Sequence, residues 1–179
     1  MVHTLAERTE VDLARAGDKA AFDSLVRSRM DAMYRLSLAI VGNESDAADA
    51  VQESFIDVWR HLPNLRDGGK FDAWLQRIVV NSCRMALRSK SRRHVRELPM
   101  ASLESVDRPA PQAGDIALLR AALGHLSADQ RAMLALHHVD ERPLSEIAAI
   151  LSIPVGTAKS RLFTARTALG RALAEEEAR

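Results

Sequence analysis

The chain has 179 residues, 47% of them apolar and 4% aromatic, and its formal net charge at pH 7 is +1. This length allows one medium domain or two small ones, and the abundance of Ala, Leu and Arg with sparse glycine favours helices over sheets. A single cysteine, Cys83, excludes an internal disulfide and a cysteine-based zinc cluster. Cys83 lies in an apolar-periodic segment, which predicts a buried and unreactive thiol.

No segment of the sequence is typical of a targeting signal or a membrane span. The first twelve residues have no long apolar core, and the longest apolar run near them, Leu38–Val41, is too short to cross a bilayer. We therefore expect a cytoplasmic protein without membrane insertion.

Two helices are predicted in the first third of the chain. Gly17 and Asp18 open the first one, whose apolar positions recur at helical spacing, and Gly42 ends it. The second is expected from about Asp46 to Leu62, with inward positions at Ala48, Val51, Phe55, Val58 and Leu62. Its opposite side is acidic or amide-bearing and consists of Asp46, Asp49, Gln52, Glu53 and Asp57.

A turn-rich loop and a cationic helix follow. Pro63 stops the second helix, and residues 63–70 carry the Pro and Gly residues of a loop. A third helix is expected from near Phe71 to about Arg93. Its buried stripe is predicted at Trp74, Leu75, Ile78 and Val79, and its outer face at Arg77, Arg84 and Arg88.

Charge is distributed in blocks along the chain. Residues 44–73 hold seven acidic and three basic side chains, whereas residues 74–96 hold seven basic and no acidic ones. Such blocks indicate separate surfaces for separate partners, with the cationic ones facing a polyanion. Solvated surface remains the alternative for any single block.

The middle of the chain reads as a linker between two helical domains. Residues 94–114 contain Pro99, Pro109 and Pro111 with little periodicity. Helices are then expected over 116–126 and 127–139, and Ser127 with Gln130 forms a capping box. The predicted fold is all-α, with a first domain over 1–96, a linker over 97–114 and a second domain over 115–179.

The most informative segment, Leu144–Arg166, is typical of a helix-turn-helix. Ser145 is expected to cap its first helix, Ser152 lies in the turn, and Pro154 suits the first position of its second helix. From Ser152 to Leu173 there are four basic residues and no acidic ones. The buried positions are predicted at Ala158, Leu162, Ala165 and Leu169. A helix of this shape and charge fits the major groove of DNA, although simple helix packing gives the same pattern.

The sequence resembles a family at two places. One is DAADAVQESFIDVWRHLP followed by FDAWLQRIVVN, which resembles conserved region two of the sigma-70 family of bacterial RNA polymerase sigma factors. The other is LSEIAAILSIPVGTAKSRLFTARTAL, which resembles region four. The short length resembles the extracytoplasmic-function (ECF) group. The resemblance implies a transcription initiation factor, without catalysis or a cofactor, that binds core RNA polymerase and promoter DNA and is controlled by an anti-sigma factor.

The resemblance also implies roles for individual residues. The polymerase-binding positions are Asp49, Gln52 and Glu53. The −10 promoter element is expected to bind the loop 64–70 and the helix after it, at Asn64, Lys70, Trp74, Arg77, Asn81, Arg84 and Arg88. The −35 element is expected to bind the second helix of the helix-turn-helix, at Thr157, Lys159, Ser160, Arg161 and Arg166.

Other residues are given structural interpretations, and other functions stay open. Trp59 and Trp74 are expected in the core, the pair His137 and His138 on the surface without a metal, and Glu175–Glu177 in solvent. One alternative function is a sigma mimic that binds anti-sigma factors. Another is a repressor or activator that uses the helix-turn-helix alone. An enzyme is least favoured, because no Gly-rich phosphate loop and no nucleophile with a placed base are found.

Overall fold

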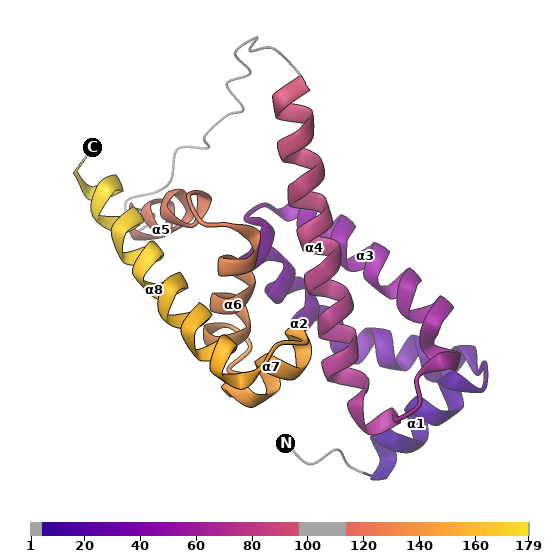
Figure 1. Cartoon of the computed structure of the whole chain (residues 1–179). Coiled ribbons are helices and arrows are strands. Elements are labelled where there is room, and N and C mark those ends of the chain that lie inside the picture. Colours follow the sequence, from indigo (N-terminus) through magenta and orange to yellow (C-terminus); the bar gives the residue numbers. More distant parts are fainter. Residues whose placement is uncertain (1–4, 97–113, 179) are drawn as a thin grey trace.

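A computed structural model describes residues 5–96 and 114–178, and the secondary-structure elements of this part of the chain are all helices (Figure 1). The N-terminal domain contains α1 (Leu5–Arg15), α2 (Lys19–Val41), α3 (Glu44–His61) and α4 (Phe71–Arg96), with the short 3₁₀ turns η1 (Leu62–Asn64) and η2 (Gly68–Lys70) between α3 and α4. The C-terminal domain contains α5 (Gly114–Gly124), α6 (Ala128–His138), α7 (Leu144–Leu151) and α8 (Val155–Glu177).

The predicted fold class is confirmed, and most of the predicted linker, residues 97–113, lies outside the described residues. Within the described ranges, none of the helices is long and apolar enough to cross a membrane.

Local side-chain chemistry sets the ends of α2 and the start of α3. The Asp18 carboxylate accepts hydrogen bonds from the backbone N–H groups of Ala20 and Ala21, at 2.9 and 3.1 Å, which satisfies donors that have no partner inside the helix. Gly42 ends α2 in the left-handed conformation, with φ 86°. Asn43 then caps α3 by accepting from the N–H of Asp46 at 2.8 Å. The predicted ends of α2 are confirmed, and α3 begins at Glu44, two residues before the predicted start near Asp46.

The N-terminal core lies where α2, α3 and α4 meet. Leu36, Val58 and Leu75 are fully buried there, and each such side chain stabilises the fold by about 1.5–3 kcal/mol. The prediction for α3 was wrong at Ala48, which is exposed, whereas Ala47 and Ala50 are buried. The other predicted inward positions, Val51, Phe55, Val58 and Leu62, are buried as expected.

The C-terminal domain contains the predicted helix-turn-helix in α7 and α8. The capping box at Ser127 and Gln130 is confirmed, with both reciprocal hydrogen bonds formed. Ser152 occupies the turn with φ 55°, a left-handed conformation usually taken by glycine. The predicted cap at Ser145 was wrong, because α7 begins at Leu144 after Pro143 and has no side-chain cap. Pro154 is the N-cap of α8 rather than its first residue.

Candidate nucleic-acid and protein interfaces

The outer side of α3 carries the residues predicted to bind polymerase. Asp49, Gln52 and Glu53 are all exposed. With about 100° per residue, these three positions lie beside Ile56 and Trp59 around the helix. The acidic and amide side chains therefore border an apolar strip on the same helix.

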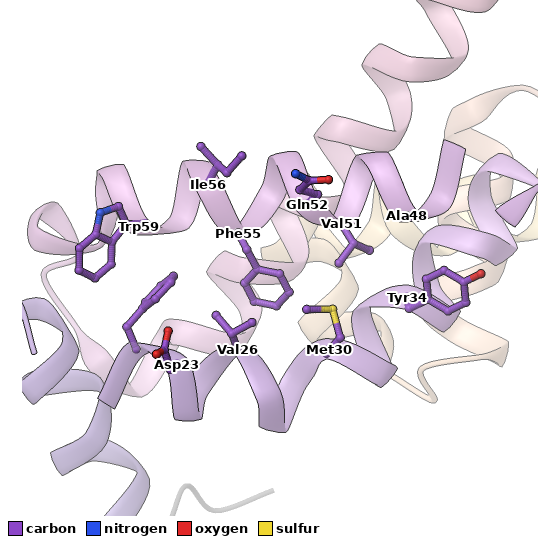
Figure 2. A pocket seen from close by; sticks show the side chains of 11 residues that line it. Asp23, Val26, Met30, Tyr34, Ala48, Val51, Gln52, Phe55, Ile56 and Trp59 are labelled. Atoms are coloured by element: carbon purple, nitrogen blue, oxygen red, sulfur yellow. The ribbon is translucent and has the colours of Figure 1, made fainter. Parts of the chain in front are cut away.

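That strip forms one wall of a groove between α2 and α3 (Figure 2). The groove has a volume of about 520 Å³. Its walls are mainly apolar and include Val26, Met30, Val51, Phe55, Ile56 and Trp59, with Gln52 and Asp23 at the rim. Trp59 is 39% exposed and packs edge-on against Phe22 at 4.8 Å between ring centroids. The expectation of core packing was therefore wrong for Trp59.

Sequence reasoning did not find this groove, although a signal for it was present. Phe22, Val26, Met30 and Tyr34 recur at intervals of four along α2, in a row that the core only partly covers. Together with Ile56 and Trp59 on α3, this row forms an apolar surface that the packing of α2 against α3 does not fully cover.

The loop predicted to contact the −10 element is held at both ends. Leu62 before it and Phe71 after it are buried at 0% and 1% exposure, whereas Asn64 and Lys70 are exposed. Within the loop, the Asp67 side chain accepts from the N–H of Gly69 at 3.0 Å and lies 3.7 Å from the Lys70 ammonium. The exposed polar side chains therefore project from a turn of defined shape.

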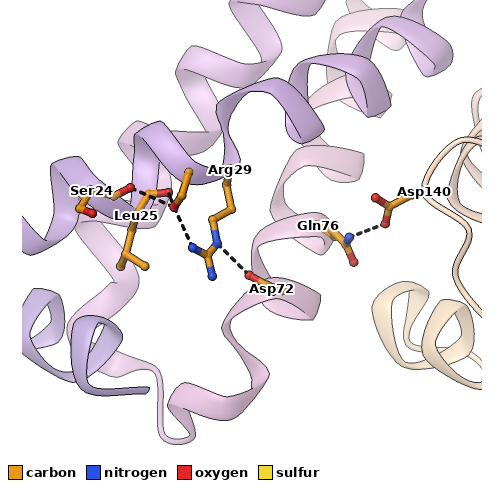
Figure 3. A network of polar contacts seen from close by, with 7 residues as sticks. Ser24, Leu25, Arg29, Asp72, Gln76 and Asp140 are labelled. Carbon is orange, nitrogen blue, oxygen red and sulfur yellow. Dashed lines mark hydrogen bonds and ion pairs between the residues drawn. The ribbon is translucent and has the colours of Figure 1, made fainter. Parts of the chain in front are cut away.

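The start of α4 is fixed by a contact with α2. The Arg29 guanidinium donates to the Asp72 carboxylate at 3.2 Å (Figure 3). It also lies 5.9 Å from the centre of the Phe71 ring. Trp74 is half-buried, with its ring 6.2 Å from that of Phe71. Further along α4, the Arg84 guanidinium donates to the side-chain oxygen of Asn81 at 3.3 Å.

The outer face of α4 is not fully open, because the C-terminal domain packs against it. Arg77 donates to the backbone carbonyls of Ala149 and Ile150 at the end of α7, at 2.6 and 3.0 Å. Arg84 forms an ion pair with Asp129 of α6 at 2.7 Å. Arg77, Arg84 and Arg88 thus lie on the outer face of α4 as predicted, and Arg77 and Arg84 also contact the second domain, which was not predicted.

Two further polar contacts join the domains. The Gln76 amide donates to the Asp140 carboxylate at 2.5 Å (Figure 3), and Arg131 donates to the backbone carbonyl of Ile40 at 3.2 Å. Burial lowers the pKa of Arg131. Arg142 holds Asp140 in place at 2.8 Å, and its ion pairs with Asp140 and Glu146 raise its pKa despite its burial.

Cys83 lies in the N-terminal core on α4. It is fully buried, and burial raises the pKa of its thiol from 9.0 to about 11. The predicted unreactive thiol is consistent with this environment, because the thiolate is the reactive form.

The second helix of the helix-turn-helix, α8, presents the predicted −35 residues in a definite arrangement. Ala158, Leu162 and Ala165 are buried against α6 and α7, and Lys159, Ser160, Arg161 and Arg166 are exposed, with Thr157 half-buried. At about 100° per residue, Lys159 and Arg166 lie on one flank of the exposed face and Arg161 on the other. Ser160 lies between them.

Phe163 is a candidate that the sequence analysis missed. It is 73% exposed and lies on the same outer face as Ser160. The signal was an aromatic side chain one residue beyond the buried Leu162, in a chain with only four phenylalanines. Phe163 therefore places an apolar ring between the cations of the predicted DNA-binding face.

Two other sequence interpretations are now placed. His138 accepts a hydrogen bond from Arg166 at 3.3 Å, and its pKa is lowered by burial and by the charges of His137 and Arg166. In the acidic tail, Glu176 contacts His125 at 2.7 Å, so Glu176 is not simply solvated as predicted. Among the described residues there is no group of three or more His, Cys, Asp or Glu side chains that could hold a metal.

The fold and these surfaces define a two-domain helical protein with a helix-turn-helix, a class that binds DNA. Two family models match the chain: Sigma-70 region 2 over residues 25–93 and Sigma-70, region 4 over residues 116–169. The chain belongs to the ECF group of the sigma-70 family of RNA polymerase sigma factors. Members of this family are transcription initiation factors, so the enzyme alternative is excluded.

Curated relatives agree with this assignment. The chain is 34% identical to the ECF sigma factor SigM of Mycobacterium tuberculosis, with 93% of this chain and 86% of SigM covered. It is 30% identical to the RNA polymerase sigma-H factor of Pseudomonas aeruginosa, with 91% of both covered. It is 37% identical to SigE of Mycolicibacterium smegmatis, of which it spans 65%.

Two solved structures have a similar fold. CnrH, in a complex with the cytosolic domain of CnrY, is 26% identical with a TM-score of 0.72, covering 95% of this chain and 98% of CnrH. The sigma factor RpoE of Bartonella quintana, in a complex with the anti-sigma factor NepR, is 28% identical with a TM-score of 0.67, covering 85% of this chain and 96% of RpoE.

Proposed function

We propose that this sigma factor contacts its three partners through three separate surfaces. Core RNA polymerase binds the outer side of α3 with the adjoining groove, the −10 element binds the 64–70 loop with α4, and the −35 element binds α8. The observation that carries this proposal is the segregation of charge, acidic on α3 and cationic on α4 and α8. Polyanionic DNA requires cationic surfaces, and an acidic surface suits a protein partner.

The polymerase surface combines Asp49, Gln52 and Glu53 with the apolar groove beside them. A charged rim around an apolar centre is the usual composition of a protein interface. The complementary element is a helix with apolar side chains for the groove and basic ones for the rim. Trp59 and Ile56 supply its anchors, because partly exposed large apolar side chains contribute most when a partner covers them.

The α8 surface reads duplex DNA in the major groove. Lys159 and Arg166 on one flank and Arg161 on the other contact phosphates, while Ser160 and Phe163 between them face the base edges. Thr157, near the start of the helix, contributes a hydroxyl. The aromatic ring of Phe163 provides an apolar surface for a thymine methyl group.

The α4 surface captures a single strand. Asn64, Lys70, Trp74, Asn81 and Arg88 offer hydrogen-bonding, stacking and cationic groups. Arg77 and Arg84 belong to the same surface, but they contact the C-terminal domain in this structure. Promoter binding by these two arginines therefore requires the domains to separate.

We also propose cytoplasmic localisation and control by an anti-sigma factor. One of the solved structures named above contains the sigma factor RpoE with the anti-sigma factor NepR, and the other contains CnrH with the cytosolic domain of CnrY. A partner that covers α3 or stabilises the packed domains withholds the factor from polymerase.

The decisive test is a charge reversal on the polymerase surface. Glu53→Arg is expected to weaken capture by purified core RNA polymerase about ten-fold or more, because it places a cation opposite basic side chains. Glu175→Arg, an equal change of charge on the exposed end of α8, serves as the matched control. Unchanged capture by Glu53→Arg, or equal losses for both variants, contradicts the proposed surface.

A further inference from the structure

Helix α1 precedes the segment that matches Sigma-70 region 2, which begins at residue 25. It nevertheless belongs to the N-terminal core. Val11 and Ala14 are each 2% exposed, and the helix contacts α2 as well as the two turns η1 and η2. The 64–70 loop is therefore supported by a helix that neither family segment includes.

Gly68 of the loop lies close to α1. A Cβ atom at this position would lie 3.3 Å from Cγ1 of Val11 and 3.4 Å from a carboxylate oxygen of Asp12. That carboxylate is itself held by Arg15 at 2.9 Å. Gly68 does not have a positive φ, so its backbone conformation is open to other residues. What favours glycine here is the close approach of α1.

Backbone hydrogen bonds shape the loop. Leu65 N–H donates to the carbonyl of Leu62 and Lys70 N–H to that of Asp67, both at 3.0 Å. These bonds shape the two turns, and the N–H of Phe71, which donates to the carbonyl of Gly68, joins η2 to the start of α4. The buried ends at Leu62 and Phe71 fix two points, and Val11 against Gly68 supplies a third between them.

We propose that α1 positions the −10 loop, with Val11 as a positioning residue that sets the place of η2 through Gly68. The inference rests on the proposed function of the loop. It adds that base preference at the −10 element depends on a residue that does not touch DNA. A displacement of η2 moves Lys70, which lies in this turn, relative to Asn64, which lies in η1.

The test is a pair of compensating size changes, measured in holoenzyme with core RNA polymerase. Gly68→Ala adds a methyl group against Val11, and Val11→Ala removes the Cγ1 methyl group that lies 3.3 Å from it. Leu13→Ala, on the same helix but 48% exposed, is the matched control. Base preference is measured with a DNA pool whose single-stranded segment is randomised and which is sequenced after binding. Affinity is measured with the pool already enriched by the wild type.

We expect Gly68→Ala to bind the enriched pool about five-fold more weakly, the effect of an overpacking cost of about 1 kcal/mol. Its base preference should change at one or more positions, while capture by core polymerase stays the same. The double variant Val11→Ala/Gly68→Ala should bind more tightly than Gly68→Ala and recover the wild-type preference. Wild-type behaviour of Gly68→Ala, or absence of rescue in the double variant, overturns the proposal.

A second measurement separates this proposal from the function of the loop. Urea unfolding of the four chains in the Val11 and Gly68 cycle reports their coupling without any DNA. Coupling in stability with no change in DNA binding by Asn64→Ala/Lys70→Ala means that the loop does not read the promoter. Absence of coupling in stability means that α1 does not hold the loop, whatever the loop binds.

Discussion

Adjacent residues of α8 allow DNA contact to be separated from folding. Phe163 is 73% exposed and Leu162 only 5% exposed, although one peptide bond joins them. Replacing Phe163 by alanine removes little buried apolar surface and should therefore have little effect on the free energy of unfolding. Replacing Leu162 by alanine leaves a cavity in the C-terminal core, at a cost of about 2–5 kcal/mol of unfolding free energy.

The loss expected for Phe163→Ala follows from its exposed surface. A phenylalanine ring removes about 150–250 Å² from water when it is buried. If DNA covers half of the 73% that is exposed, about 55–90 Å² is lost on substitution, or about 1.5–2 kcal/mol. The dissociation constant for a −35 duplex should therefore rise ~10- to 30-fold.

The assay is equilibrium binding of holoenzyme to a duplex selected from a random pool by the wild-type protein. Urea unfolding of the free factor is measured in parallel. Phe163→Ala should lose affinity and keep its stability, whereas Leu162→Ala should lose stability. Binding by Phe163→Ala within about two-fold of the wild type would refute the argument, because the ring would then remain in water in the complex.

Two other predictions concern the domain contact and the core. Asp129→Ala should shift the equilibrium between packed and separated domains about two- to five-fold toward separation, because the ion pair of Asp129 with Arg84 is half-exposed. The measurement is energy transfer between dyes on cysteines introduced at Arg27 and Arg171, which should decrease. Unchanged transfer rules out a role for this pair. The raised pKa of Cys83, about 11, keeps its thiol protonated in the fold, whereas the unfolded thiol ionises near pH 9. Ionisation of Cys83 therefore leaves the free energy of unfolding unchanged below pH 8 and lowers it by up to about 3 kcal/mol between pH 9 and 11. The urea midpoint of Cys83→Ala should lack this part of the decline, and an equal decline in both proteins contradicts it.

Local chemistry explains why most helix boundaries could be predicted. Asp18, Gly42 and the Ser127–Gln130 box act within a few residues of themselves, so the sequence contains all that they need. Ser145 was misassigned because a serine near a helix start suits a cap, and the sequence does not show that α7 already begins at Leu144. The turn at Ser152 was located correctly even without the usual glycine.

Tertiary packing explains what could not be predicted. Ala47 and Ala48 are equivalent in a pattern of apolar spacing, and only the rotation of α3 against α2 distinguishes them. The periodicity of α4 correctly places Arg77 and Arg84 away from the N-terminal core. It carries no information on the second domain, which meets these arginines from elsewhere in the chain.

The domain contact has a consequence for hybrid proteins assembled from two members of this family. Each half contributes groups matched to the other, such as Arg84 to Asp129 and Gln76 to Asp140. A chimera that joins residues 1–96 of this chain to the C-terminal half of a relative keeps the buried Gln76 but loses its acceptor unless the relative has one. Such hybrids should favour separated domains, and restoring the two acidic partners should return them to the packed form.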